Sequence, residues 1–241
     1  MAQTPGPSTG VFYAYAKTII DDCTARFLIT FATRDIADTW FRAITDSVAK
    51  GYNKFASFKR ISIQFYSFDH HVCSIMDTLK DSKVAPALHD RVFITLLNDR
   101  DGRIISMVPV LNYTEHINGS SFYIRSVAHP DTYWYYDASS ETVVAHQSRR
   151  SQFTIKIADD SRGPGTIIIG SDEIYITTTS GVNVGVANRE NHLSYSANPS
   201  PLKFSSFGNR DFQIASWEDD RHPNIGPLAH KPGQGERWEL L

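Results

Sequence analysis

The sequence predicts two domains, an N-terminal α+β domain with a mixed sheet and about two helices, followed by an all-β domain. Segment 34–49 has apolar residues at the spacing of an amphipathic helix, and strand-like runs flank it on both sides. Beyond residue 120 the helical period is absent, and short strand-like runs recur at intervals of roughly 8–12 residues. The polar stretch 112–121 separates the two patterns, and we place the boundary there.

Length and composition set the broad class of protein. The 241 residues suffice for one large or two ordinary domains, and the 41% hydrophobic content is typical of a globular chain. Basic and acidic residues number 24 and 26, which argues against nucleic acid or an anionic membrane surface as the main partner. We expect a cytoplasmic protein without membrane insertion, because the first ten residues do not resemble a signal peptide and long apolar runs are absent.

The N-terminal domain is expected to span 10–115, after a Pro/Ser/Thr/Gly-rich segment 1–9 that we expect to be disordered. Residues Ile36, Trp40 and Ile44 predict the helix 34–49, and Gly51 is its expected C-terminal cap. The remaining elements follow from apolar alternation and turn residues. They are strands at 11–15, 26–32, 60–66, 91–97 and 104–110, the last two forming a hairpin, and a second helix at 73–79.

The C-terminal domain, expected at 120–241, contains three successive units of about 40 residues with short strands in each. The predicted strands are 121–127, 133–137, 142–144 and 151–155 in the first unit, 165–169, 172–177, 182–186 and 201–204 in the second, and 211–217, 224–228 and 235–240 in the third. The units close on Phe153, Phe204 and Trp238. Three units of this size predict a β-trefoil, whose closed barrel leaves few exposed strand edges.

The last strand carries a family resemblance. Its sequence, Gly-Glu-Arg-Trp-Glu-Leu, resembles the Q-x-W-x-L signature of ricin B-type β-trefoils, particularly the small fungal lectins, with Glu236 at the glutamine position. The segment Tyr-Trp-Tyr-Tyr-Asp at 133–137 occupies the place of the family's Y-L-D strand ending. The resemblance covers about half of the chain and departs from the signature in two units, since Gln152 directly precedes Phe153 and the second unit has no Q-x-W. It implies a lectin-like protein that binds sugars through trefoil loops.

A sugar site needs an aromatic face for the C–H surface of the ring and an Asp or Asn for vicinal hydroxyls. Trp134, Tyr136 and Asp137 supply these groups in the first unit. The competing interpretation places the aromatic residues in the barrel core and makes Asp137 a turn residue. The other units contribute the polar candidates Asn183, Asn191, Asp220 and Asn224.

Other chemistries have weaker support in the sequence. The run Asp-His-His-Val-Cys at 69–73 places two histidines side by side, which would point to opposite faces of a strand, so we predict no metal site. We predict neither a cofactor nor catalytic residues, since G-x-S-x-G, Walker and H-E-x-x-H motifs are absent. The glycosylation sequons at Asn112 and Asn118 are interpreted as chance matches.

The sequence therefore favours a carbohydrate-binding protein whose partner is a glycan or glycoprotein. The N-terminal domain would then serve dimerisation, as a homodimer, or a second binding event. Two alternatives stay open, because a fold does not fix a function. One is a protein-binding trefoil such as a protease inhibitor using loops at 188–201 or 219–227. The other is an enzyme with an active site in the N-terminal domain or between the domains.

Overall fold

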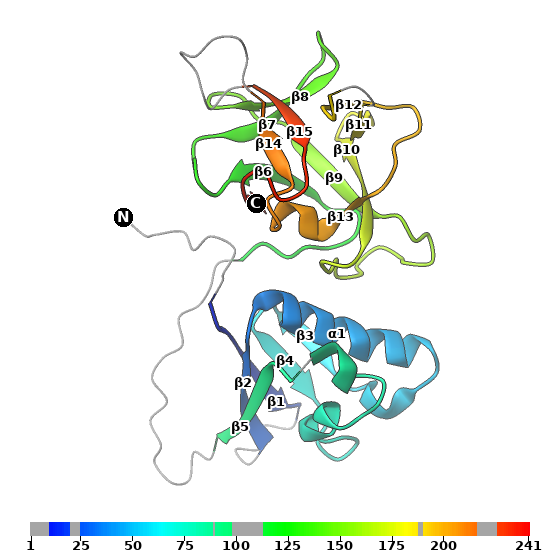
Figure 1. The fold of residues 1–241 in the computed structure, drawn as a ribbon. Helices are drawn as coiled ribbons and strands as arrows, with labels where there is room; N and C mark the ends of the chain where they lie inside the picture. The colour runs from blue at the N-terminus through cyan, green and yellow to red at the C-terminus, as the bar shows by residue number, and fades with distance from the viewer. Residues whose placement is uncertain (1–9, 20–24, 89, 98–112, 188–189, 216–225) are drawn as a thin grey trace. The chain divides into compact units, whose positions relative to one another are not determined.

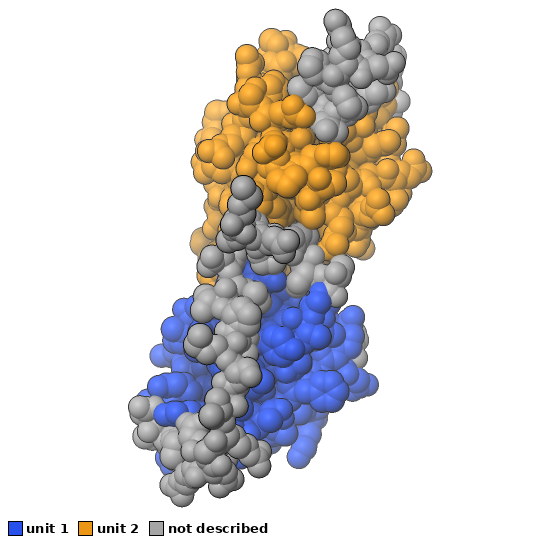
Figure 2. Space-filling view, turned by 90° about the vertical axis from the view of Figure 1, so that its left-hand side faces the viewer, with its two compact units in different colours: residues 1–113 blue, residues 114–241 orange. Residues whose placement is uncertain are grey.

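The structure is a computed structural model that describes residues 10–19, 25–88, 90–97, 113–187, 190–215 and 226–241. The chain divides into two compact units, Met1–Tyr113 and Thr114–Leu241 (Figure 2). Taken together, most of the regular structure among the described residues is β-strand, and these residues contain one α-helix. The predicted strand at 104–110 and the segment 1–9 lie outside the described residues.

The first unit is a five-stranded mixed sheet with the helix on one face (Figure 1). The strand order is β3-β4-β1-β2-β5, in which β1 and β4 are parallel and the other pairs are antiparallel. The strands are β1 (Phe12–Thr18), β2 (Arg26–Phe31), β3 (Lys59–Ser62), β4 (Phe65–Phe68) and β5 (Val92–Leu97).

Helix α1 (Arg34–Ala49) confirms the predicted helix at both ends. The Thr33 side chain caps its start by accepting a hydrogen bond from the Ile36 amide at 3.3 Å. Gly51 follows its end with a φ of 85°, a left-handed conformation that favours glycine. Trp40 lies on the buried stripe and packs against Phe31 of β2, with 5.4 Å between ring centres.

The predicted strand 60–66 is wrong, because it contains a turn that separates β3 from β4. Gln64 in this turn is 5% exposed, and its Nε2 donates to the Tyr13 carbonyl at 3.0 Å. Its own carbonyl accepts from the Tyr15 amide at 2.7 Å. Contacts with β1, distant in sequence, therefore hold the turn.

A short 3-10 helix, η3 (Ile75–Leu79), takes the place of the second predicted helix. Two further 3-10 helices, η2 (Asn53–Phe55) and η4 (Ala85–Leu88), lie before and after it. The prediction of helical structure at 73–79 was right about the location and wrong about the type and length. Ser74 caps η3 by accepting from the Met76 amide at 3.2 Å, so the local capping signal is present without an α-helical run behind it.

The described residues of the second unit form antiparallel strands and one 3-10 helix, η6 (Phe204–Phe207). The strands are β6 (Ser121–Ser126), β7 (Tyr133–Asp137), β8 (Thr142–His146), β9 (Gln152–Ile157), β10 (Glu173–Thr178), β11 (Asn183–Val186), β12 (Leu193–Tyr195), β13 (Leu202–Lys203), β14 (Phe212–Ile214), β15 (Gly226–His230) and β16 (Trp238–Leu240). The predicted strand 165–169 is represented only by an isolated bridge between Ile117 and Ile167, and β12 was not predicted.

The strand pairing has a recurring pattern. Among the antiparallel pairs formed by strands consecutive in sequence are the hairpins β7–β8, β11–β12 and β14–β15. Their second strands contact one another, through pairs Ser194↔Thr142 and Gly226↔Ala145 and a bridge His192↔Ala229. The other pairs join β16 to β6, β6 to β7 and β9, β9 to β10, and β10 to β11 and β13.

The core of the second unit is aromatic at its centre. Trp134 is fully buried, and its ring lies within 6 Å of the rings of Phe153, Phe207, Phe212 and Trp238. Two of the aromatic residues that close the predicted units, Phe153 and Trp238, therefore meet around one tryptophan, and edge-to-face contacts of this kind add to the stabilisation from burial.

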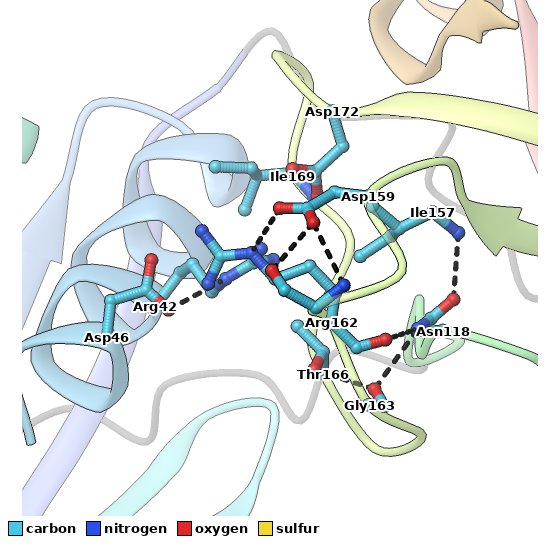
Figure 3. Close-up of polar contacts among 11 residues, drawn as sticks. Arg42, Asp46, Asn118, Ile157, Asp159, Arg162, Gly163, Thr166, Ile169 and Asp172 are labelled. Carbon is cyan, nitrogen blue, oxygen red and sulfur yellow. Dashed lines mark hydrogen bonds and ion pairs between the residues drawn. The ribbon is translucent and has the colours of Figure 1, made fainter. Parts of the chain in front are cut away.

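Asn118 joins three segments of the second unit (Figure 3). Its Nδ2 donates to the carbonyls of Arg162 and Gly163 at 2.8 and 3.1 Å, and its Oδ1 accepts from the Ile157 amide at 2.8 Å. Asn118 is 5% exposed, so its side chain is unavailable to a glycosyltransferase in the folded protein. This geometry agrees with the interpretation of its sequon as a chance match, and the sequon at Asn112 lies outside the described residues.

Candidate functional site

A polar pocket of about 390 Å³ opens on the surface of the second unit. Its lining comes from β6, β7, the start of β9 and the turn after β10. The lining residues are Tyr123, Tyr136, Arg150, Ser151, Gln152, Thr178, Thr179 and Ser180. They provide two phenols, four hydroxyls, one amide and one guanidinium, a set rich in hydrogen-bond donors and acceptors.

The alternation of side chains along the strands brings two of the lining residues to the outer surface of the sheet. Phe122 and Ile124 of β6 point into the core, so Tyr123 between them faces outward. The β6–β9 register sets Tyr123 opposite Gln152, which is exposed. An aromatic ring and an amide side chain therefore lie next to each other on the outer surface of the sheet.

Hydrogen bonds hold the other parts of the lining in place. Ser151 accepts at Oγ from the Tyr136 amide at 3.0 Å and donates its own amide to the Trp134 carbonyl at 2.9 Å. Thr178 and Ser180 share a hydroxyl hydrogen bond of 2.8 Å across the turn after β10. The Thr179 amide donates to the Gln152 carbonyl at 3.4 Å, so the turn is connected to β9.

Arg150 brings a positive charge to the pocket. Its guanidinium carbon lies 4.5 Å from the centre of the Tyr123 ring and 5.6 Å from that of Tyr133, within the range of cation–π attraction. Within the described part of the chain, Arg150 makes no ion pair. Arg125 on the same strand as Tyr123 differs in this respect, because it forms a salt bridge with Glu239 at 2.5 Å.

Tyr136 packs partly against the core. Burial raises the pKa of its phenol above the ordinary value of 10.0, and nearby negative charge from Glu141 acts in the same direction. The Tyr136 hydroxyl therefore stays protonated at neutral pH and can both donate and accept a hydrogen bond.

The structure separates the three residues predicted for the first sugar site. Trp134 is 0% exposed and cannot present a ring face to a ligand, so the prediction that it contacts a sugar is corrected in favour of the core interpretation. Tyr136 lines the pocket. Asp137 accepts from the Ser139 amide at 3.0 Å and from its hydroxyl at 2.7 Å, which lowers the pKa of Asp137, and it does not line the pocket.

The candidates from the other units are not brought into the pocket. Asn183 is half-buried in β11, where its carbonyl accepts from the Ser196 amide at 3.1 Å. Asn191 is exposed with a φ of 57°, and its carbonyl accepts from the His230 amide at 2.7 Å. Both act through their backbones in these contacts, and Asp220 and Asn224 lie outside the described residues.

Several lining residues were not among the predicted site residues, because nothing local in the sequence distinguishes them. Arg150, Gln152 and the turn at 178–180 carry no motif, and the pairing that gathers them joins segments far apart in sequence. A local signal existed for Tyr123 alone, since the buried neighbours Phe122 and Ile124 alternate with it.

The histidine pair in the first unit does not have the expected geometry. Residues 70–72 form a turn, and the rings of His70 and His71 lie 3.9 Å apart instead of on opposite faces of a strand. His70 Nδ1 and the Thr18 hydroxyl are 2.8 Å apart. Burial raises the pKa of the Cys73 thiol nearby, so this thiol is protonated at neutral pH. The part of the chain described by the structure contains no cluster of three or more His, Cys, Asp or Glu side chains suited to a metal.

Comparisons with known proteins give no family. No protein-family model and no curated protein matches the chain. Among solved structures, a complex of a BBKI mutant with bovine trypsin contains a chain with 14% sequence identity and a TM-score of 0.33, over 56% of this chain and 98% of that one. Among the described residues, no helix combines the length and apolar character needed to cross a membrane.

Proposed function

We propose that residues 114–241 form a β-trefoil that binds carbohydrate in the pocket of Tyr123, Tyr136, Arg150 and Gln152. Three hairpins with mutually paired second strands support the trefoil, because this is the arrangement expected of three repeated units around one barrel. The internal repeats of the sequence point the same way.

The chemical groups that line the pocket are the reason for proposing a carbohydrate as the ligand. Sugars present closely spaced hydroxyls that both donate and accept hydrogen bonds, and the pocket offers matching hydroxyl and amide groups at Ser151, Gln152 and Thr179. Its two tyrosines add aromatic surface for the C–H groups of a sugar ring. A small apolar ligand would instead need a deeper and more apolar cavity.

A distant relationship to the ricin B-type trefoils forms part of this proposal. Trp238 of the signature-like segment is buried in the core, and Glu236, at the glutamine position, accepts from the Ser126 hydroxyl at 2.9 Å. The signature residues thus connect β6 with the last strand. The proposed sugar pocket uses other residues and lies on the outer surface of the sheet.

The first unit supplies dimerisation or a second binding event in this proposal. Its described surface includes Phe93 and Ile61, whose side chains are 74% and 67% exposed. Paired binding sites would compensate for the weak affinity of a single sugar site through avidity. Sedimentation equilibrium of the full chain measures the oligomeric state.

Glycan binding by pocket variants tests the proposal. We expect Gln152→Ala to weaken binding to an array of neutral and charged glycans by roughly 3- to 10-fold, the effect of losing one or two hydrogen bonds. Asp137→Ala is the control, since Asp137 lies at the end of β7 and does not line the pocket. Equal loss in both variants would contradict the pocket assignment, and failure of the wild type to bind any glycan would contradict the function.

Protein binding is the second candidate function. Tyr135 lies outside the pocket lining with the Arg149 guanidinium 5.6 Å from its ring centre, and Tyr and Arg are enriched in protein interfaces. Haemagglutination that a free sugar inhibits would favour the lectin. A protease inhibitor would show inhibition of a protease panel without sugar-sensitive agglutination.

A further inference from the structure

Because Arg150 lines the pocket and makes no ion pair with a described residue, we infer that the pocket selects acidic sugars, those bearing a carboxylate or a sulfate, through the guanidinium of Arg150. This inference rests on the proposed carbohydrate function. It adds the class of sugar and assigns the residue that recognises the anionic group.

The charge balance of the lining is the first argument. Arg150 is the one charged residue among the eight that line the pocket. Two other arginines of the unit have acidic partners, Arg125 with Glu239 at 2.5 Å and Arg162 with Asp159 at 3.4 Å. Arg150 makes no ion pair with any described residue, so its charge is available to a ligand.

The position of the guanidinium is the second argument. The rings of Tyr123 and Tyr133 lie 4.5 and 5.6 Å from its carbon, and together they hold it near the pocket. A guanidinium stacked on an aromatic face keeps its N–H groups directed outward along its edge. Those donors form a planar fork that matches the two oxygens of a carboxylate or sulfate.

The neighbouring groups favour an acidic sugar over a bare anion. Gln152, Thr179 and Ser180 are exposed beside Arg150, and they provide hydrogen-bonding groups for the ring hydroxyls that accompany the acid. A ligand that used Arg150 alone would leave this polar surface to water. The pocket therefore fits a sugar whose anionic group contacts Arg150 while its hydroxyls contact the turn at 178–180.

Arg149 provides a matched control. It is exposed, adjacent in sequence and stacked on Tyr135, with 5.6 Å between guanidinium carbon and ring centre, and it does not line the pocket. The substitutions Arg149→Gln and Arg150→Gln remove the same charge from neighbouring positions. A difference between them isolates the pocket from the general surface potential.

The experiment measures calorimetric binding of the full chain to lactose, 3′-sialyllactose and 3′-sulfolactose, with polyglutamate as a non-sugar anion. The two acidic probes distinguish carboxylate from sulfate. We expect at least one of them to bind about 10- to 100-fold more tightly than lactose, as expected for charge-assisted hydrogen bonds. Arg150→Gln should abolish that preference, Arg150→Lys should retain part of it, and Arg149→Gln should leave it unchanged.

Each other outcome overturns a distinct statement. Binding of lactose as tightly as both acidic probes overturns the acidic class and leaves the carbohydrate function standing. Equal losses in Arg149→Gln and Arg150→Gln overturn the assignment to Arg150. Polyglutamate binding as tightly as the acidic sugars overturns the sugar class, and no binding of any sugar overturns the proposed function as well. Circular dichroism checks that the Arg150 variants are folded, which their surface position predicts.

Discussion

At the scale of single residues, Asn118 joins segments of the second unit through hydrogen bonds that its neighbours in the sequence do not reveal. Its side chain donates to two backbone carbonyls and accepts from one backbone amide of other segments, and Asn118 is 5% exposed. We expect Asn118→Ala to lower the free energy of unfolding by about 2–4 kcal/mol, because the buried Ile157 amide loses its partner and the carbonyls of Arg162 and Gly163 each lose one hydrogen bond. Urea denaturation measures this, with the half-buried Asn183→Ala as control. An unfolding midpoint equal to the wild type in Asn118→Ala would refute the role of the network.

Glu236 is expected to make the stability of the second unit depend on pH. Burial raises the pKa of this carboxyl above its ordinary value of 4.5, while its Oε1 is buried without a hydrogen-bond partner. Well below pH 4.5 the carboxyl is protonated in both the folded and the unfolded state, so its titration does not change the free energy of unfolding. As the pH rises from 4.5 through the raised folded pKa, the unfolded state ionises first, so stability falls and then stays reduced.

A glutamine at this position removes the titration. We therefore expect Glu236→Gln to be more stable than the wild type at pH 7 and to show a smaller difference at pH 4. Thermal unfolding of both proteins at the two pH values gives the comparison. A stability difference that does not change between pH 4 and pH 7 would show that burial of the charge at Glu236 is unimportant.

At the scale of secondary-structure elements, an element can be predicted from the sequence when the contacts that fix it are local, and not when they come from distant segments. Helix α1 was predicted at both ends because its cap at Thr33, its apolar stripe and Gly51 are all local in sequence. The turn between β3 and β4 was missed because Gln64 is held by β1, some fifty positions earlier in the chain. The same distinction applies to the candidate site, where Tyr136 was identified from its strand and Arg150 was not.

Gly235 provides the sharpest prediction at this scale. A Cβ placed there would lie 2.1 Å from the Phe212 carbonyl oxygen, at the bridge between Phe212 and Glu236. We expect Gly235→Ala to separate β14 from the last strand and to destabilise the unit by about 2–3 kcal/mol. At Gly208 the nearest contact to a Cβ would be 3.7 Å, so Gly208→Ala should change stability by less than about 0.5 kcal/mol. Denaturant unfolding of the two alanine variants makes the comparison, and equal stabilities would contradict the steric argument.

At the scale of the whole molecule, the two compact units have separate cores, and every lining residue of the pocket belongs to Thr114–Leu241. Separate cores allow units to fold on their own. The sequence predicted a division of the chain from the loss of helical periodicity, and it predicted strands at β7, β8 and β11 but not at β12. It could not predict the pocket, because that depends on which strands pair and not on the number of strands.

The roles proposed for the two units lead to a prediction about avidity. If the first unit dimerises the protein, the full chain presents two pockets, whereas the isolated unit 114–241 presents one. We expect both to bind a monovalent sugar with the same Kd, because the pocket is complete in the second unit. Only the full chain should agglutinate glycan-coated particles, where linked sites raise the apparent affinity by about 10²–10⁴-fold. Agglutination by the isolated unit at the same concentration would place the multivalency within 114–241 and remove the proposed role of the first unit.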